Sequence, residues 1–388
     1  MSLRQREVMK ADLGARVARA QLVSVLLAFV APAVLAGLAQ ALVAMHLLTA
    51  DSGAYKRVLS LHSILVVFFG IVPGVPFALG GFLASSQRGQ RSARLGLASL
   101  VLFWIGALVV SVAILGGKID SGFYYLASLG LRSRWSITAL SGGLLLAAMG
   151  CALNALRITM LDKTQLERTL WTQSMRVGAI TQALVLPILV VLVVVVAWAP
   201  SKLSCGWVHE TNRSQFLYQL FWFAMQPAIL AAAPPVLGFV TNYLDNWAAE
   251  SSGRSSLVLH SAVAYSVLSF TTWGIHSASI GQSARMTALF SANCLLMVVP
   301  AILPYPVWLA QLRAIPSGFR MHAWVPVSII ATLGICVLLA LPLATPLANA
   351  SEQGRILRIV CLHLYGAVIA GAIIAGKRWI LTTPAPAL

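Results

Sequence analysis

The histidines are the residues of this sequence best placed to do chemistry inside its long apolar runs. The chain has seven, and four of them, His62, His260, His276 and His363, fall inside or at the edge of such runs. A neutral imidazole among apolar helices can bind iron or copper, and it can equally hydrogen-bond a neighbouring carbonyl. Acidic residues, the usual sign of a proton or cation path in a membrane, lie almost entirely outside these runs.

The apolar runs that must position these histidines recur along the whole chain. Hydrophobic residues make up 59% of the 388 and charged residues 10%, and the mean hydropathy is +0.86, so there is too little polar surface to coat a soluble globule. A helix needs roughly 20 apolar residues to cross a bilayer. The sequence therefore predicts an all-α, polytopic membrane helix bundle of about ten transmembrane helices. The expected spans are 21–48, 59–85, 95–117, 136–158, 175–199, 217–243, 256–279, 287–312, 324–345 and 358–380.

The net charge of +17 reports orientation in a membrane rather than nucleic-acid binding. The basic residues are scattered through short loops instead of forming a patch on a soluble domain, and most of them fall inside if the N-terminus is inside. We therefore expect a multi-pass protein of the bacterial inner (cytoplasmic) membrane, with the lipid bilayer as its first partner and both termini cytoplasmic. Residues 1–20 are expected to form a basic cytoplasmic tail, and 21–388 a single membrane domain. No small-residue cleavage site follows the tail, so it does not resemble a signal peptide.

Several stretches resemble, in serial order, subunit I of cytochrome c oxidase in the haem-copper oxidase family. The second expected span reads HSILVVFFGIVP from His62, the sixth reads LYQLFWFAMQP up to Pro227, and the tenth contains His363-Leu364-Tyr365 before Gly371. Further matches run from Trp273 to Trp308, so the resemblance covers roughly 55–380. It implies the helical scaffold of that subunit, in a degenerate and C-terminally shorter member.

The resemblance also implies that the copper site of the family is broken here. Copper is held in the family by three imidazoles, and those positions are Gln226, Ile275 and His276 in this sequence. A single histidine cannot hold the copper ion. The tyrosine that serves as radical donor falls on Leu230, and the terminal residues of the two proton paths fall on Ala228 and Pro304. The resemblance therefore predicts no copper and no oxygen reduction.

Haem ligands are partly retained. The resemblance gives His62 and Tyr365 the two positions that bind the low-spin haem, and His363 the position that binds the high-spin haem. A one-residue slip of the tenth span would change which role His363 takes. One five-coordinate haem is one interpretation, and a haem-free bundle in which His62, His276 and His363 make hydrogen bonds is the other.

Three functional hypotheses remain open. The leading one is a non-catalytic subunit or assembly partner of a respiratory complex, which contacts other membrane subunits and holds at most one haem. The alternative is a haem-binding electron-transfer protein or terminal oxidase subunit with altered ligands, and the question whether the chain is an enzyme stays open. The third is a transporter that reuses the emptied cavity, with polar lining residues drawn from Gln226, Thr287, Ser291 and Asn293.

Overall fold

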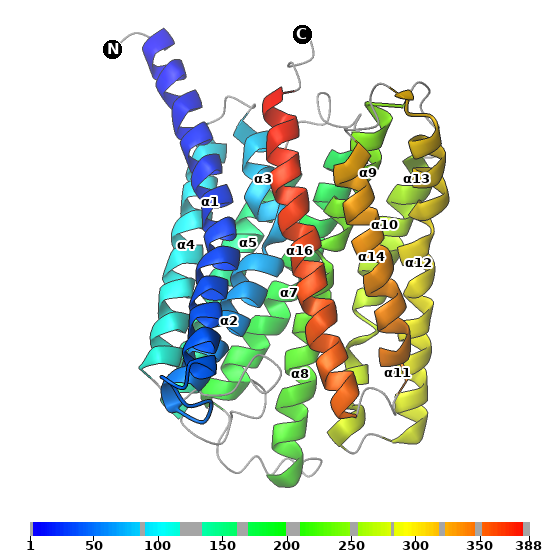
Figure 1. The fold of residues 1–388 in the computed structure, drawn as a ribbon. Helices are drawn as coiled ribbons and strands as arrows, with labels where there is room; N and C mark the ends of the chain where they lie inside the picture. Colours follow the sequence, from blue (N-terminus) through cyan, green and yellow to red (C-terminus); the bar gives the residue numbers. More distant parts are fainter. Residues whose placement is uncertain are drawn as a thin grey trace.

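The computed structural model is a bundle of long, roughly parallel helices (Figure 1). It describes residues 3–85, 90–116, 134–160, 170–198, 210–248, 255–280, 283–317, 323–345 and 351–382. Within these ranges, nine helical stretches are long and apolar enough to cross a membrane, and Ser256–Ser269 is a shorter apolar helix. The prediction of an all-α polytopic bundle is confirmed. The seventh expected span, 256–279, corresponds to this shorter helix and the 3-10 helix that follows it.

The first half of the chain forms the group of helices coloured blue to green in Figure 1. These elements are α1 (Leu3–Ala44), α2 (Gly53–Leu65), η1 (Val66–Ile71), α3 (Gly74–Ser85), α4 (Gln90–Leu115), α5 (Arg134–Thr159) and α7 (Leu170–Trp198). Helix α1 is continuous through the expected tail and the first span.

The second half of the chain forms the remaining helices. Its elements are α8 (Glu210–Leu230), α9 (Ala233–Asp245), α10 (Ser255–Ser269), η3 (Trp273–Ile280), α11 (Ala284–Leu296), α12 (Val298–Ile302), α13 (Pro304–Arg313), α14 (Trp324–Leu343) and α16 (Glu352–Thr382). Helix α16 packs against α14 on one side and against α3 and η1 on another. The start of α1 and the end of α16 lie at the same end of the bundle (Figure 1).

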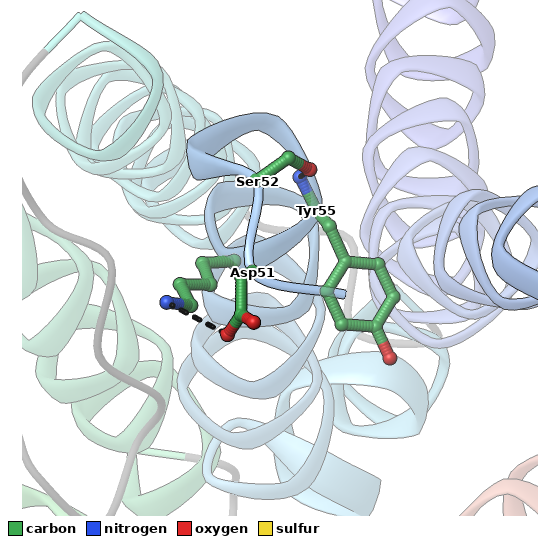
Figure 2. Close-up of polar contacts among 4 residues, drawn as sticks. Asp51, Ser52 and Tyr55 are labelled. Atoms are coloured by element: carbon green, nitrogen blue, oxygen red, sulfur yellow. Dashed lines mark hydrogen bonds and ion pairs between the residues drawn. The ribbon is translucent and has the colours of Figure 1, made fainter. Parts of the chain in front are cut away.

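Polar side chains define the start of α2. The Ser52 hydroxyl accepts a hydrogen bond from the Tyr55 amide at 3.3 Å, which caps the helix (Figure 2). Lys56 forms an ion pair with the fully exposed Asp51 at 3.6 Å. The cap therefore fixes where the histidine-bearing span begins, while the exposed ion pair contributes little to stability.

The second span changes from α-helix to π-helix at Val66, about one turn after His62. Residues Val66–Ile71 form a turn of π-helix, and Gly74 adopts a left-handed backbone with φ of 45°. Pro73 has no N–H to continue the helix, so carbonyl groups are left without helical partners. The Gln182 amide on α7 donates to the carbonyl oxygens of Val72 at 2.5 Å and Pro73 at 3.2 Å. This side chain therefore satisfies the break and ties α7 to it.

A buried guanidinium joins α1, α3, α4 and α5. Arg157 is 2% exposed, and it donates to Gln21 Oε1 at 3.2 Å, Ser92 Oγ at 3.1 Å and the Gly81 carbonyl at 3.3 Å. Gln21 in turn donates to Ser99 Oγ and to Asn154 Oδ1. Arginine keeps its charge in proteins, so these neutral acceptors hold a buried cation.

Candidate haem and cavity sites on two faces of α16

Helix α16 presents its two candidate ligands in different directions. His363 and Tyr365 are two residues apart, which corresponds to roughly 200° around an α-helix with 3.6 residues per turn. The two side chains therefore cannot bind the same cofactor or metal ion. The structure places His363 towards α2 and Tyr365 towards α8.

His62 on α2 and His363 on α16 lie side by side, although the chain separates them by most of its length. Their ring centroids are 5.8 Å apart and the ring planes differ by 26°. Histidine nitrogens bind zinc at roughly 2.0–2.1 Å, so two imidazoles on opposite sides of one metal ion of similar size have centroids roughly 6 Å apart. The centroid spacing is therefore compatible with two imidazoles that would hold one metal ion.

A backbone contact orients the ring of His363. Its Nδ1–H donates to the Ile359 carbonyl at 2.7 Å, which leaves Nε2 with its lone pair. The buried Nδ1 of His62 has no hydrogen-bond partner among the described residues. Metal-binding histidines commonly donate their second ring N–H to a carbonyl group, which fixes the tautomer and the ring orientation. The His363 contact is of this kind.

Close packing of α1, η1 and α16 supports the pair. A Cβ on Gly70 would lie 3.1 Å from the Phe29 ring, and one on Gly366 would lie 3.4 Å from Ile71 and 3.5 Å from Phe29. These two glycines therefore let the phenyl ring of Phe29 fit between the helices. His62 is partly buried and His363 is exposed, so the pair is reached from the outer surface of the bundle.

Tyr365 belongs to a separate site on the other face of α16. Its side chain is buried, and its hydroxyl donates to the Ile229 carbonyl of α8 at 3.2 Å. It lines a cavity of about 280 Å³ whose walls come from α8, α9, α10, η3, α11, α12, α14 and α16. The resemblance assigned Tyr365 to the low-spin haem opposite His62; in the structure the ring that lies next to His62 is that of His363.

The three positions that correspond to copper ligands converge on this cavity. Gln226, Ile275 and His276 all line it. His276 Nε2 and Gln226 Oε1 are 3.0 Å apart, and the Trp222 ring stacks on the imidazole with centroids 3.6 Å apart and an interplanar angle of 13°. The three positions therefore carry one imidazole, one amide and one alkyl side chain, and the alkyl side chain cannot bind a metal ion.

The other positions singled out in the sequence have apolar or structural surroundings. Leu230 lines the cavity, whereas Ala228 is buried in α8 and Pro304 begins α13. Of the four residues considered for a transport path only Gln226 lines the cavity; the Asn293 amide donates to the Thr271 carbonyl instead. Among the described residues, no group of three or more His, Cys, Asp or Glu is arranged to hold a metal ion.

Several cavity residues were missed by sequence reasoning. Cys361 and Arg358 on α16, Cys336 on α14 and Tyr265 on α10 all line the cavity. None belongs to a motif with a characteristic spacing. The 3.6-residue period of α16 would have grouped Arg358, Cys361 and Tyr365 on one face, apart from His363.

Comparisons with known proteins show which family the chain resembles along most of its length. The family model described as "Cytochrome C and Quinol oxidase polypeptide I" matches residues 16–381. The quinol oxidase subunit 1 of Bacillus subtilis is 20% identical over 350 residues, which cover 84% of this chain and 52% of that protein. The alternative cytochrome c oxidase subunit 1 of Bradyrhizobium diazoefficiens is 21% identical over 290 residues, covering 68% and 49%. The cytochrome c oxidase subunit 1 of a Synechocystis strain is 22% identical over 272 residues, covering 66% and 49%. The chain therefore spans about half the length of these curated relatives.

Proposed function

The chain belongs to the family of polypeptide I of cytochrome c and quinol oxidases, and we propose that within this family it is a haem-binding membrane subunit that does not reduce oxygen. The observation that carries the proposal is the facing pair of His62 and His363, with ring centroids 5.8 Å apart. Haem is the cofactor of the family, and two neutral imidazoles are a donor set suited to it.

Each histidine has a distinct part in holding the group. His363 would offer Nε2, because its Nδ1–H is donated to Ile359. His62 would offer its ring from α2, where the π-helical turn and the Gln182 hydrogen bonds hold the following backbone. A haem held by these two imidazoles would supply one-electron transfer rather than oxygen reduction.

The cavity on the other face of α16 supports the proposal that the protein does not reduce oxygen. Copper in this family needs three imidazoles, and the structure offers His276 with Gln226 and Ile275. The Nε2 atom of His276 is already hydrogen-bonded to Gln226. This donor set does not fit copper, so no step of oxygen reduction is assigned to it.

Subunits of this kind work within larger assemblies, and we include such a role in the proposal. Exposed apolar side chains cover the outer faces of α1, α4 and α14, including Val34, Leu108 and Leu338. Lipid or other membrane subunits of a respiratory complex would cover these faces, since both are apolar. The bacterial inner membrane, with both termini cytoplasmic, remains the proposed location.

Absorption spectroscopy of the purified, dithionite-reduced protein tests the haem site. We expect the sharp bands of one six-coordinate low-spin haem per chain, and their loss in both His62→Leu and His363→Leu. His260→Leu, on the exposed face of α10, and His276→Leu, in the cavity, should keep the bands. A wild-type protein without haem, or bands that survive loss of either facing histidine, would overturn this part.

Metal analysis of the same samples tests the absence of oxygen chemistry. We expect iron at one atom per chain, copper at background level and no oxygen uptake with an artificial electron donor. Stoichiometric copper, or oxygen uptake abolished by His276→Leu, would contradict the proposal. Mass spectrometry of protein that co-purifies in mild detergent identifies the partner subunits.

A further inference from the structure

The cavity beside α16 has a charged side chain in its wall. Arg358, in the second turn of α16, lines the cavity from within the candidate membrane span Gln353–Arg378. Among the described residues, no Asp or Glu lines it. A guanidinium keeps its charge in proteins, and ionisable side chains inside a membrane span commonly mark a binding site or an ion path. The charge of the wall therefore favours an anionic group in the cavity.

Two polar side chains lie near Arg358. Its guanidinium interacts electrostatically with His276, and His276 Nε2 is hydrogen-bonded to Gln226 Oε1 at 3.0 Å. Since the amide oxygen of Gln226 accepts from the imidazole, its amide nitrogen keeps two N–H donors. This end of the cavity therefore offers a cation and hydrogen-bond donors.

The other hydroxyl groups of the lining lie elsewhere or already donate their hydrogens. The Thr272 hydroxyl donates to the Ser269 carbonyl at 3.2 Å, and the Tyr365 hydroxyl donates to the Ile229 carbonyl at 3.2 Å. Tyr265 interacts electrostatically with Tyr365, so it lies near that residue. Its hydroxyl makes no hydrogen bond among the described residues. One available hydroxyl therefore lies at the end of the cavity marked by Tyr365.

Apolar side chains join the two ends. Tyr365 follows Arg358 by seven residues, which corresponds to a rise of roughly 10 Å along α16. The volume of about 280 Å³ is close to the lower limit of ligand pockets, roughly 300 Å³, so it suits one short chain. The wall on α14 and α16 carries aliphatic side chains and thiols, which pack as small apolar groups. These are Leu333, Cys336, Val337, Ala340, Leu343, Ala344, Cys361 and Leu362.

We propose that the cavity binds a single-chain amphiphilic carboxylate, with the carboxylate at Arg358 and the alkyl chain directed along α16 towards Tyr365. A carboxylate only accepts hydrogen bonds, and it forms its strongest ones with a guanidinium. A cationic head group would be repelled by Arg358, and a neutral one would lack the charge-assisted bond. The ring of Tyr265 belongs to the wall beside the far end of the chain.

This inference rests on the proposed function in one respect, since the cavity must be free of haem and copper. It does not depend on the pair of His62 and His363, which lies on the other face of α16. The haem spectrum recorded on each sample therefore separates the two: a protein without haem that still binds the carboxylate would refute only the proposed function.

Photolabelling of the full chain in lipid nanodiscs tests the site on the wild-type protein. The probes are a medium-chain alkanoate with a diazirine near the end of its chain, the matched methyl ester and the matched alkylamine. At alkaline pH, where the alkanoate is ionised, we expect saturable labelling by the alkanoate alone, competed by excess unlabelled alkanoate. Mass spectrometry should map the label to peptides of α10, α14 and α16. Equal labelling by the ester or the amine, or no saturable labelling, would overturn the proposal.

Variants of Arg358 test where the carboxylate lies. In Arg358→Gln, half-saturation should need about tenfold more alkanoate, the consequence of losing a hydrogen bond to a charged group. Arg358→Lys keeps the charge and should restore most of the labelling. Arg94→Gln, an exposed site on α4, removes the same charge away from the cavity and should change nothing.

Thermal unfolding and the haem spectrum check that each variant is folded. Unchanged labelling in folded Arg358→Gln would refute the proposal. Tyr265→Phe should weaken labelling less than Arg358→Gln does, and a larger loss in Tyr265→Phe would place the carboxylate at the opposite end of the cavity and overturn it.

Discussion

At the scale of single residues, the face of α16 on which a side chain lies decides which of the two candidate sites it can join. His363 and Tyr365 are separated by one leucine, yet one ring faces His62 and the other reaches the Ile229 carbonyl. A tyrosine hydroxyl that donates to a backbone carbonyl contributes to packing and is not free to bind iron in the other direction. The same helix thus serves two separate sites.

Replacement of Tyr365 by phenylalanine distinguishes these roles. We expect Tyr365→Phe to lower the free energy of unfolding by about 1 kcal/mol, because the Ile229 carbonyl loses the hydroxyl donor and keeps only the 3.4 Å hydrogen bond from the Ala232 amide. The haem spectrum should not change. Tyr55→Phe is the control, since its hydroxyl makes no hydrogen bond among the described residues. Thermal unfolding in detergent and the reduced absorption spectrum are the two measurements, and loss of haem in Tyr365→Phe would restore it as a ligand.

Sequence patterns identified the histidines but could not decide how they pair. The serial motifs gave His62, His276 and Gln226 their surroundings, because prolines and aromatic residues at fixed spacings mark the same spans. The sequence does not show how α16 is rotated about its axis. If the alignment of this span is shifted by one or two residues, the span is still apolar and still contains Gly371. Only contacts with Ile229 on α8 and with His62 on α2 settle the rotation.

At the scale of elements, glycines set the distances at which the helices pack. A Cβ on Gly106 would lie 2.6 Å from the Gly143 carbonyl oxygen, so α4 and α5 pack with their backbones close together. Gly96 on α4 has a different neighbour, since its missing side chain leaves room for the Arg157 guanidinium. Small residues allow such close contacts in membrane bundles, where the hydrophobic effect does not drive helices together.

Substitution of Gly96 by alanine measures how much this arrangement contributes. The new Cβ would lie 2.6 Å from Arg157 Nη1 and 2.9 Å from Cζ, so the guanidinium must move away from Gln21 and Ser92. We expect Gly96→Ala to lower the free energy of unfolding by about 1–3 kcal/mol, the cost of unsatisfied buried polar groups. Gly142→Ala on α5 is the control, because nothing lies within 4 Å of its Cβ.

The control should be neutral or should stabilise the protein by up to about 1 kcal/mol, since alanine favours helix more than glycine does. Thermal unfolding in detergent compares the two variants under identical conditions. If Gly96→Ala were as stable as Gly142→Ala, the hydrogen bonds of Arg157 would contribute nothing measurable to the folded state.

At the scale of the whole molecule, α16 packs against helices from both halves of the chain (Figure 1). The pair of His62 and His363 lies where α16 meets α2 of the first half, and the cavity lies where α16 meets helices of the second half. Hydropathy predicted the bundle well because each span had to be apolar. It placed the seventh span less well, since only the 15 residues of α10 form an α-helix there before η3 begins.

Orientation in the membrane gives the last prediction. The link between α1 and α2 lies at the end of the bundle opposite the start of α1 and the end of α16 (Figure 1). If both termini are cytoplasmic, as the distribution of Lys and Arg predicts, this link is external. In a Cys205→Ser background, Asp51→Cys should react with a membrane-impermeant maleimide in intact spheroplasts, because Asp51 is fully exposed. Lys377→Cys, near the exposed end of α16, should react only after permeabilisation. The reverse pattern would invert the protein and place its basic residues on the external side.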